Sequence, residues 1–140
     1  MITQARCDPD FTKPHTETPD RARRGAHSYF KGLSAEDSVA RWYQARGGSI
    51  LEHRWRGTAG EIDLIIVESG VVVFCEVKSS KCLTRAIEAL SPRQVMRLRQ
   101  TAAEYLGTLP AGELTEMRFD FAVVDGHGKP VIMQNGFGDV

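Results

Sequence analysis

Residues 61–78 read EIDLIIVESGVVVFCEVK and form the most strand-like stretch of the chain. Two runs rich in Val, Ile and Phe, residues 61–68 and 71–78, flank the pair Ser69-Gly70. This arrangement predicts two antiparallel strands joined by a tight turn. Apolar side chains occupy both faces of these strands, which predicts a sheet that is covered on both sides.

The turn also predicts the register of the two strands. With Ser69-Gly70 at the tip, Asp63 faces Glu76 and Glu61 faces Lys78, and alternation puts all four side chains on one face. Facing carboxylates repel each other unless a cation neutralises them. Lys78 offsets one charge, whereas a divalent cation such as Mg²⁺ or Mn²⁺ offsets both. The pattern therefore predicts a metal site.

The competing interpretation is a surface strand pair with ordinary cross-strand ion pairs, in which Glu61 is the partner of Lys78. The tripeptide Glu-x-Lys alone favours this interpretation because it is common. The apolar flanks favour the metal site, since they place the acids at the rim of a buried layer. Such a site can polarise a phosphoryl oxygen and lower the pKa of a bound water.

The flanking segments predict helices around this hairpin. A first helix begins at Ser34, with Asp37 as its capping partner, and ends before Gly47. Glu36 lies near its apolar face, where it either complements the helix dipole or binds a metal. Pro92 opens a second helix over residues 92–106. Further strands are predicted at residues 50–55, 118–124 and 131–133. The fold class is therefore α/β, a sheet flanked by helices.

Composition limits the remaining possibilities. The chain has 140 residues, a formal net charge of zero and 26% charged residues, as in a globular protein. Residues 1–25 lack apolar periodicity and are expected to be a flexible extension of a domain spanning 26–140. No apolar run approaches the ~20 residues of a membrane helix, and the charged, proline-containing N-terminal residues are not expected to be a secretory signal. With three cysteines and no CxxC pair, the expected location is cytoplasmic, without a membrane partner.

The motifs GEIDLI at 60–65 and FCEVK at 74–78 resemble those of the YraN family. The resemblance extends over residues 32–125 and includes Glu36, Tyr43, Arg97-Leu98 and Arg118-Phe119-Asp120. This family comprises small bacterial proteins of unassigned function. They are similar to archaeal Holliday-junction resolvases of the PD-(D/E)xK superfamily. The resemblance implies a restriction-endonuclease-like mixed sheet flanked by helices.

The resemblance also implies roles for individual residues. Asp63, Glu76 and the Val77 carbonyl are the expected metal ligands, with Glu36 as the helix-borne acid and Lys78 as the catalytic lysine. Substrate contacts are expected from Gln94, Arg93 and Arg97, although solvated charge is an equal alternative for each arginine. The chain departs from the family pattern at Ser80, where an Arg is frequent, and at Gln94, where a Lys is usual.

These observations predict a Mg²⁺- or Mn²⁺-dependent nuclease that hydrolyses DNA phosphodiester bonds, on branched or single-stranded DNA in repair or recombination. Branched-DNA enzymes of the superfamily are usually dimers, which makes a homodimer the expected assembly on that substrate. The alternative is a nucleic-acid-binding or scaffold protein that keeps the nuclease fold without turnover. Intact Asp63, Glu76 and Lys78 favour the enzyme, and the missing Arg at position 80 favours the alternative.

Overall fold

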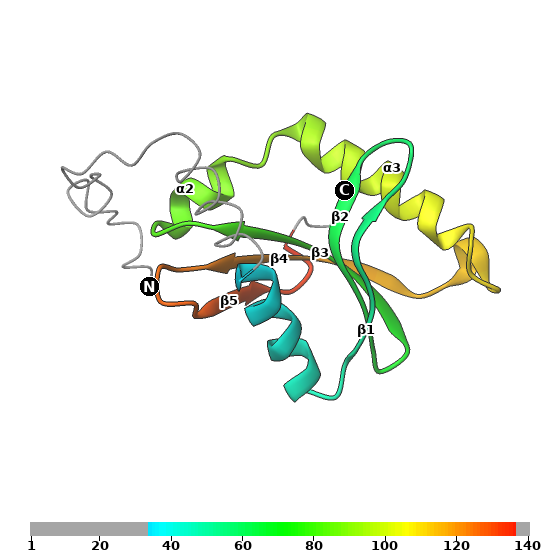
Figure 1. Cartoon of the computed structure of the whole chain (residues 1–140). Coiled ribbons are helices and arrows are strands. Elements are labelled where there is room, and N and C mark those ends of the chain that lie inside the picture. Colours follow the sequence, from blue (N-terminus) through cyan, green and yellow to red (C-terminus); the bar gives the residue numbers. More distant parts are fainter. Residues whose placement is uncertain (1–33, 137–140) are drawn as a thin grey trace, which may run out of the picture.

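The computed structural model describes residues 34–136, which form one five-stranded sheet flanked by helices (Figure 1). A first helix, described over residues 34–45, leads into the sheet. The strands are β1 (Ser49–Arg56), β2 (Glu61–Glu68), β3 (Val71–Ser79), β4 (Met117–Val124) and β5 (Pro130–Met133). The helices α2 (Leu83–Glu88) and α3 (Pro92–Leu106) and a short 3₁₀ helix, η3 (Gly112–Leu114), connect β3 to β4. The α/β class predicted from the sequence is confirmed.

The strands follow one another across the sheet in the order β1-β2-β3-β4-β5. All neighbours are antiparallel except β3 and β4, which run parallel because α2 and α3 carry the chain back between them. The sheet is therefore mixed, as predicted. Its twist turns β1 and β2 across the direction of β4 and β5 (Figure 1).

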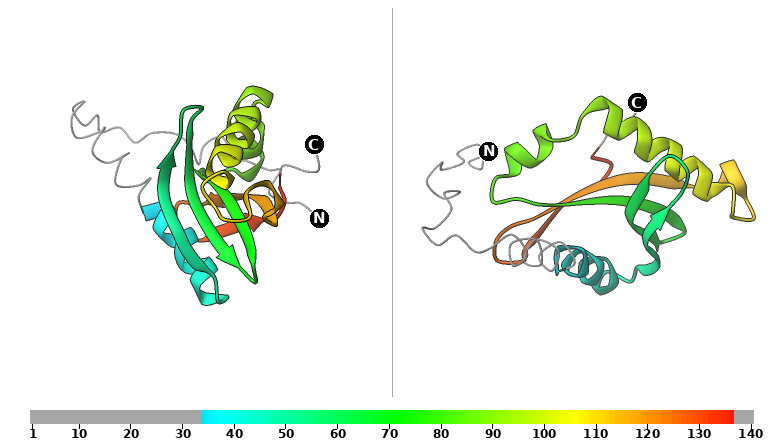
Figure 2. Two further views of the ribbon diagram at one scale, coloured as in Figure 1. Left: turned by 90° about the vertical axis from the view of Figure 1, so that its right-hand side faces the viewer. Right: turned by 45° about the horizontal axis from the view of Figure 1, so that its top comes forward.

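The helices cover both faces of the sheet, as the two apolar faces of the central hairpin predicted. The first helix lies on one face, and α2 and α3 lie on the other (Figure 2). Val39 and Tyr43 of the first helix pack with Leu64 and Ile66 of β2. On the opposite face, Leu98, Ala102 and Tyr105 of α3 pack with Ile65 and Phe74.

The central hairpin has the predicted register over most of its length. Leu64 pairs with Cys75 and Ile65 with Phe74, and Ser69 and Gly70 both adopt positive φ angles, 51° and 82°, at the turn. The second predicted helix also has the predicted bounds, with Ser91 as its cap. The sequence did not predict α2, which has six residues.

Two further expectations concern the N-terminal extension and the absence of a membrane helix. The flexible extension expected at 1–25 lies outside the described residues, so the division into 1–25 and 26–140 stays a prediction. Among residues 34–136, no helix combines the length and apolar character that a membrane span requires.

Candidate functional site

The hairpin changes its geometry where the predicted site begins. Regular pairing of β2 with β3 ends at Leu64 and Cys75, one position before Asp63. Ile62 packs against the α3 side with Ile65, although Leu64 packs against the first helix. Alternation of side chains is thus broken around Asp63. The prediction that Asp63 and Glu76 are ladder partners is therefore wrong, and so is the pairing of Glu61 with Lys78.

The Asp63 carboxylate is nevertheless turned toward β3, the strand that carries Glu76. Its Oδ2 atom accepts a hydrogen bond from the Val77 backbone amide at 2.9 Å. Burial and, next, the nearby Glu76 carboxylate together raise the pKa of Asp63 to about 7, against the opposing effects of the Val77 amide and Lys78. The structure therefore brings the two predicted acids together.

Glu76 has two polar partners at the same oxygen atom. Lys78 Nζ lies 3.4 Å from Glu76 Oε2, and Gln94 Nε2 donates a hydrogen bond to Oε2 at 3.2 Å. Glu76 is only 8% exposed, so these contacts compensate a buried charge. Glu61 instead pairs with Arg56 at 3.4 Å, which corrects its predicted pairing with Lys78.

Glu36 comes from the first helix and is held by a partner on β1. Arg54 Nε lies 2.9 and 3.1 Å from the two carboxylate oxygens of Glu36, whose side chain is 12% exposed. Burial raises the pKa of Glu36, the Arg54 hydrogen bond opposes that rise, and the charge of Asp63 adds to it. Arg54 was not among the residues predicted for the site. The contact joins a helix to a strand, and no local sequence pattern indicates it.

These acids do not make a ready three-ligand cage. Within residues 34–136, no group of three or more His, Cys, Asp or Glu side chains is arranged to hold a metal ion. Asp63 and Glu76 form a close pair, whereas Glu36 is bound to Arg54. The predicted set of acids is thus only partly assembled.

A cleft of about 180 Å³ adjoins the acid pair on the α3 side. Glu76, Gln94 and Arg97 line it together with the backbone of Gly60. Thr58 fixes the β1–β2 loop to α3, since its amide and hydroxyl both donate to Glu104 Oε1, at 2.9 and 3.2 Å. Because Glu76 lines it, the cleft has one wall in common with the acidic site. Arg93 is exposed in the first turn of α3 and does not line the cleft.

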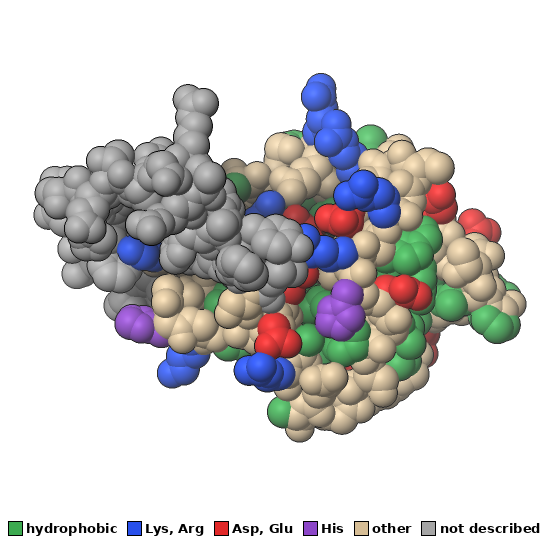
Figure 3. All heavy atoms as spheres, in the orientation of Figure 1, with side chains coloured by type: hydrophobic (Ala, Val, Ile, Leu, Met, Phe, Trp, Pro, Cys, Tyr) green, Lys and Arg blue, Asp and Glu red, His purple; other side chains and the backbone are tan. Residues whose placement is uncertain are grey.

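One face of the molecule carries both signs of charge. Figure 3 shows Lys and Arg side chains interspersed with Asp and Glu side chains across the middle of one face. This face is mixed rather than uniformly basic, so contacts to a polyanion would depend on individual residues. Ser80, at the position of the missing Arg, closes the turn after β3, where its hydroxyl donates to the Cys82 carbonyl at 2.9 Å.

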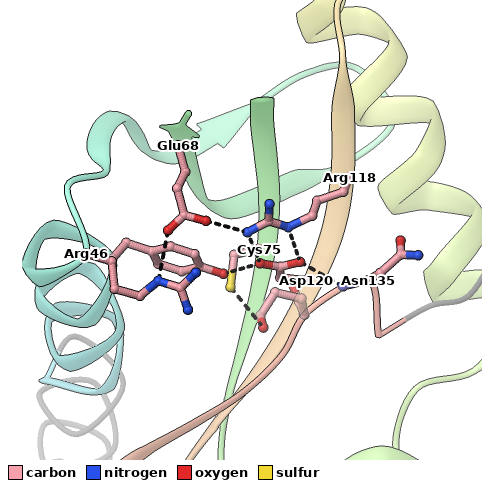
Figure 4. A network of polar contacts seen from close by, with 8 residues as sticks. Arg46, Glu68, Cys75, Arg118, Asp120 and Asn135 are labelled. Carbon is pink, nitrogen blue, oxygen red and sulfur yellow. Dashed lines mark hydrogen bonds and ion pairs between the residues drawn. The ribbon is translucent and has the colours of Figure 1, made fainter. Parts of the chain in front are cut away.

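A separate group of buried charges holds β2, β3 and β4 together (Figure 4). Asp120 is fully buried and accepts hydrogen bonds from Tyr43 at 2.5 Å, Arg118 at 3.0 Å and the Asn135 amide at 2.9 Å. Arg118 also donates to Glu68 at 2.8 Å. Asp120 is thus satisfied by structural contacts from three residues.

The fold and the site define a class: an α/β protein with a mixed sheet, an acidic pair and an adjacent lysine at one end of its central hairpin. The pattern of uncharacterised protein family UPF0102 matches residues 35–124. The chain belongs to this family, which confirms its resemblance to the YraN family.

Curated relatives match over most of their length. A UPF0102 protein of Ruegeria pomeroyi is 50% identical over 117 residues, which cover 84% of this chain and 95% of the relative. A UPF0102 protein of Roseobacter denitrificans is 45% identical over 123 residues, with 88% and 95% coverage. A UPF0102 protein of Dinoroseobacter shibae is 46% identical over 115 residues, with 82% and 86% coverage. None of these three names states an activity.

Proposed function

We propose that this protein is a divalent-metal-dependent nuclease that hydrolyses phosphodiester bonds in single-stranded or branched DNA during repair or recombination. The observation that carries the proposal is the pair of close carboxylates, Asp63 and Glu76, with Lys78 Nζ 3.4 Å from Glu76 Oε2. A buried carboxylate pair without a shared cation raises the energy of its charged state. Burial first, and then the charge of Glu76, raise the pKa of Asp63 to about 7, in line with this cost.

The donor set fits Mg²⁺ or Mn²⁺. Both are hard cations that prefer carboxylate oxygens, and Mg²⁺ commonly binds through one or two carboxylates together with waters and substrate phosphates. Asp63 and Glu76 would supply the two carboxylates, and the Val77 carbonyl is the proposed additional ligand. A cation held there would polarise a phosphoryl oxygen and generate the water nucleophile.

The neighbouring side chains have separate tasks in this proposal. The Val77 amide orients Asp63, and the Gln94 amide group orients Glu76. Lys78 keeps a positive charge at the rim of the site, where its side chain is 33% exposed and able to meet negative charge developing on a phosphate. Arg97, in the adjoining cleft, is placed to contact a flanking phosphate.

The size of the cleft favours single-stranded or unstacked DNA as the substrate. Its volume of about 180 Å³ is below that of pockets for drug-sized ligands, ~300–1,000 Å³. It would hold at most one small unstacked group, such as a single base, and not a stacked base pair. For branched DNA we propose a homodimer, since two copies would bring two sites to one junction.

The test is a cleavage panel of single-stranded, duplex, flap and four-way DNA with Mg²⁺, Mn²⁺ or EDTA. The proposal expects metal-dependent products from single-stranded or branched substrates, abolished by Glu76→Gln and retained by Arg56→Gln. Arg56 is a suitable control because it lies on β1 and pairs with the more exposed Glu61. If DNA is bound but never cleaved with either metal, the proposal fails and the nucleic-acid-binding or scaffold function replaces it.

A further inference from the structure

The ion pair between Arg54 and Glu36 joins the first helix to β1 beside the acid pair. Arg54 Nε donates to both carboxylate oxygens of Glu36, at 2.9 and 3.1 Å. Asp63 and Glu61 are near enough for their charges to act on both members of the pair. Arg54 is therefore the cation of this helix-borne acid in the metal-free protein.

The backbone of Arg54 is itself unusual. Its φ angle is 50°, in the left-handed region that non-glycine residues seldom adopt. The flanking pairs His53–Leu64 and Trp55–Ile62 are regular, whereas Arg54 and Asp63 between them are not paired. Such strain persists only where surrounding contacts maintain it. The interaction with Glu36 is a contact of this kind, and it lies directly beside the acid pair.

The charges explain why Glu36 is not part of a three-acid cluster. Three carboxylates, those of Glu36, Asp63 and Glu76, share two nearby cations, Arg54 and Lys78. Lys78 contacts Glu76, and Arg54 contacts Glu36. Glu36 is only 12% exposed and cannot remain charged without a partner at low cost. Arg54 is 36% exposed and can turn to solvent more readily.

We propose that Arg54 is an exchangeable counter-ion: it holds Glu36 in the metal-free protein and gives it up when a divalent cation binds Asp63 and Glu76. The inference rests on the proposed metal-dependent function and deepens it. Glu36 moves from a monovalent to a divalent cation, so the third acid joins the site only when the site is loaded. Arg54 is then a positioning residue, which acts through Glu36 rather than on the substrate.

Mn²⁺ titration calorimetry on the full chain without DNA tests this exchange. Arg54→Gln should tighten Mn²⁺ binding about tenfold, because Glu36 no longer has to leave a partner. Arg56→Gln removes a charge from the same strand and controls for the general electrostatic effect, so it should change the affinity much less. Arg54→Lys, which keeps the charge but not the guanidinium, should give an intermediate affinity and serves if Arg54→Gln does not fold.

Glu36→Gln distinguishes the proposed exchange of Glu36 from a purely electrostatic effect of the Arg54 charge on the metal. In a Glu36→Gln background, Arg54→Gln should leave Mn²⁺ affinity nearly unchanged, since the carboxylate that moves is absent. Thermal unfolding is the second readout: metal-free Arg54→Gln should unfold at a lower temperature than the wild type, and saturating Mn²⁺ should remove most of the difference.

Two results overturn the inference alone. One is weaker Mn²⁺ binding by Arg54→Gln, which would mean that Arg54 orients Glu36 for the metal. The other is equal tightening with and without the Glu36 carboxylate, which would mean that Arg54 acts only through its charge. If neither the wild type nor any variant binds Mn²⁺, the proposed function itself fails, and the exchange fails with it.

Discussion

The Asp63 carboxylate accepts a hydrogen bond at 2.9 Å from the backbone amide of Val77, one residue beyond Glu76. This contact ties an acid of β2 to the strand that carries the second acid, beyond the end of the regular ladder at Leu64 and Cys75. It keeps two carboxylates close in a buried position, where their repulsion remains until a proton or a cation relieves it.

The first prediction concerns the pH dependence of the metal-free protein. Burial and Glu76 raise the pKa of Asp63 from 3.8 to about 7, so the folded state holds a proton that the unfolded state has released. This contribution to stability is complete below pH 3.8 and is lost as the pH rises through about 7. The free energy of unfolding, measured by urea denaturation, should therefore lose the Asp63 contribution between about pH 4 and pH 7 and level off above that range.

Asp63→Asn should flatten this profile and stabilise the metal-free protein at pH 8. Asparagine can still accept the Val77 hydrogen bond, but it carries no charge to repel Glu76. Asp37→Asn is the matched control, because Asp37 is exposed and pairs with Arg41 on the helix surface. A clear loss of stability in Asp63→Asn at pH 8 would instead show that Asp63 is half of a structural ion pair.

The second prediction concerns Lys78. Lys78→Met removes the cation nearest to Glu76, so the metal-free protein should lose about 1–2 kcal/mol of stability in chemical denaturation. Cleavage should be lost as well, even with saturating Mn²⁺. Lys129→Met, at an exposed position before β5, should leave both unchanged. Full cleavage by Lys78→Met would remove the lysine from the mechanism.

The third prediction concerns Gln94, whose side chain contacts Glu76 Oε2. Gln94→Ala removes the hydrogen bond to Glu76 Oε2 but keeps the helix cap, since the cap uses the backbone amide of Gln94. Metal affinity or activity should fall about 10–100-fold, as for other residues that orient a ligand. Gln100→Ala, at an exposed position of the same helix, should behave as the wild type. An unchanged metal affinity and activity in Gln94→Ala would show that the contact is incidental.

The fourth prediction separates the structural charges from the candidate site. Arg118→Met leaves the fully buried Asp120 and the buried Glu68 without their shared cation, so it should cost about 3–5 kcal/mol of stability. The metal affinity of the remaining folded protein should not change at low temperature. A small effect on stability would mean that Tyr43 and Asn135 alone satisfy Asp120.

The sequence predicted the parts of this fold that local chemistry determines. The turn at Ser69-Gly70 determines the hairpin register between the turn and the pair Leu64–Cys75. Ser91-Pro92 determines where α3 begins. The helix α2 was missed because its six residues are too few to show a helical period. Its cap is a cysteine, Cys82, whose side chain accepts from the Arg85 amide, and cysteine is not a usual capping signal.

The candidate site was predictable only in part, because two of its relationships depend on tertiary structure. The break in alternation around Asp63 lies where the β2–β3 ladder ends, and Glu61 pairs with Arg56 instead of the predicted Lys78. The Arg54–Glu36 pair joins a helix to a strand, and no local pattern marks an arginine as the partner of that acid. The acids themselves were predictable from their spacing along two paired strands.

The central claim is that Asp63 and Glu76 together bind one divalent cation, and calorimetric titration of Mn²⁺ tests it most directly. Titrations at pH 8, where Asp63 has lost its proton, should compare the wild type with Asp63→Asn and Glu76→Gln, with and without single-stranded DNA. The account predicts one Mn²⁺ per wild-type chain, and loss of that binding in both variants. Binding of Mn²⁺ by the variants with wild-type affinity, or no binding by the wild type even with DNA, would contradict it.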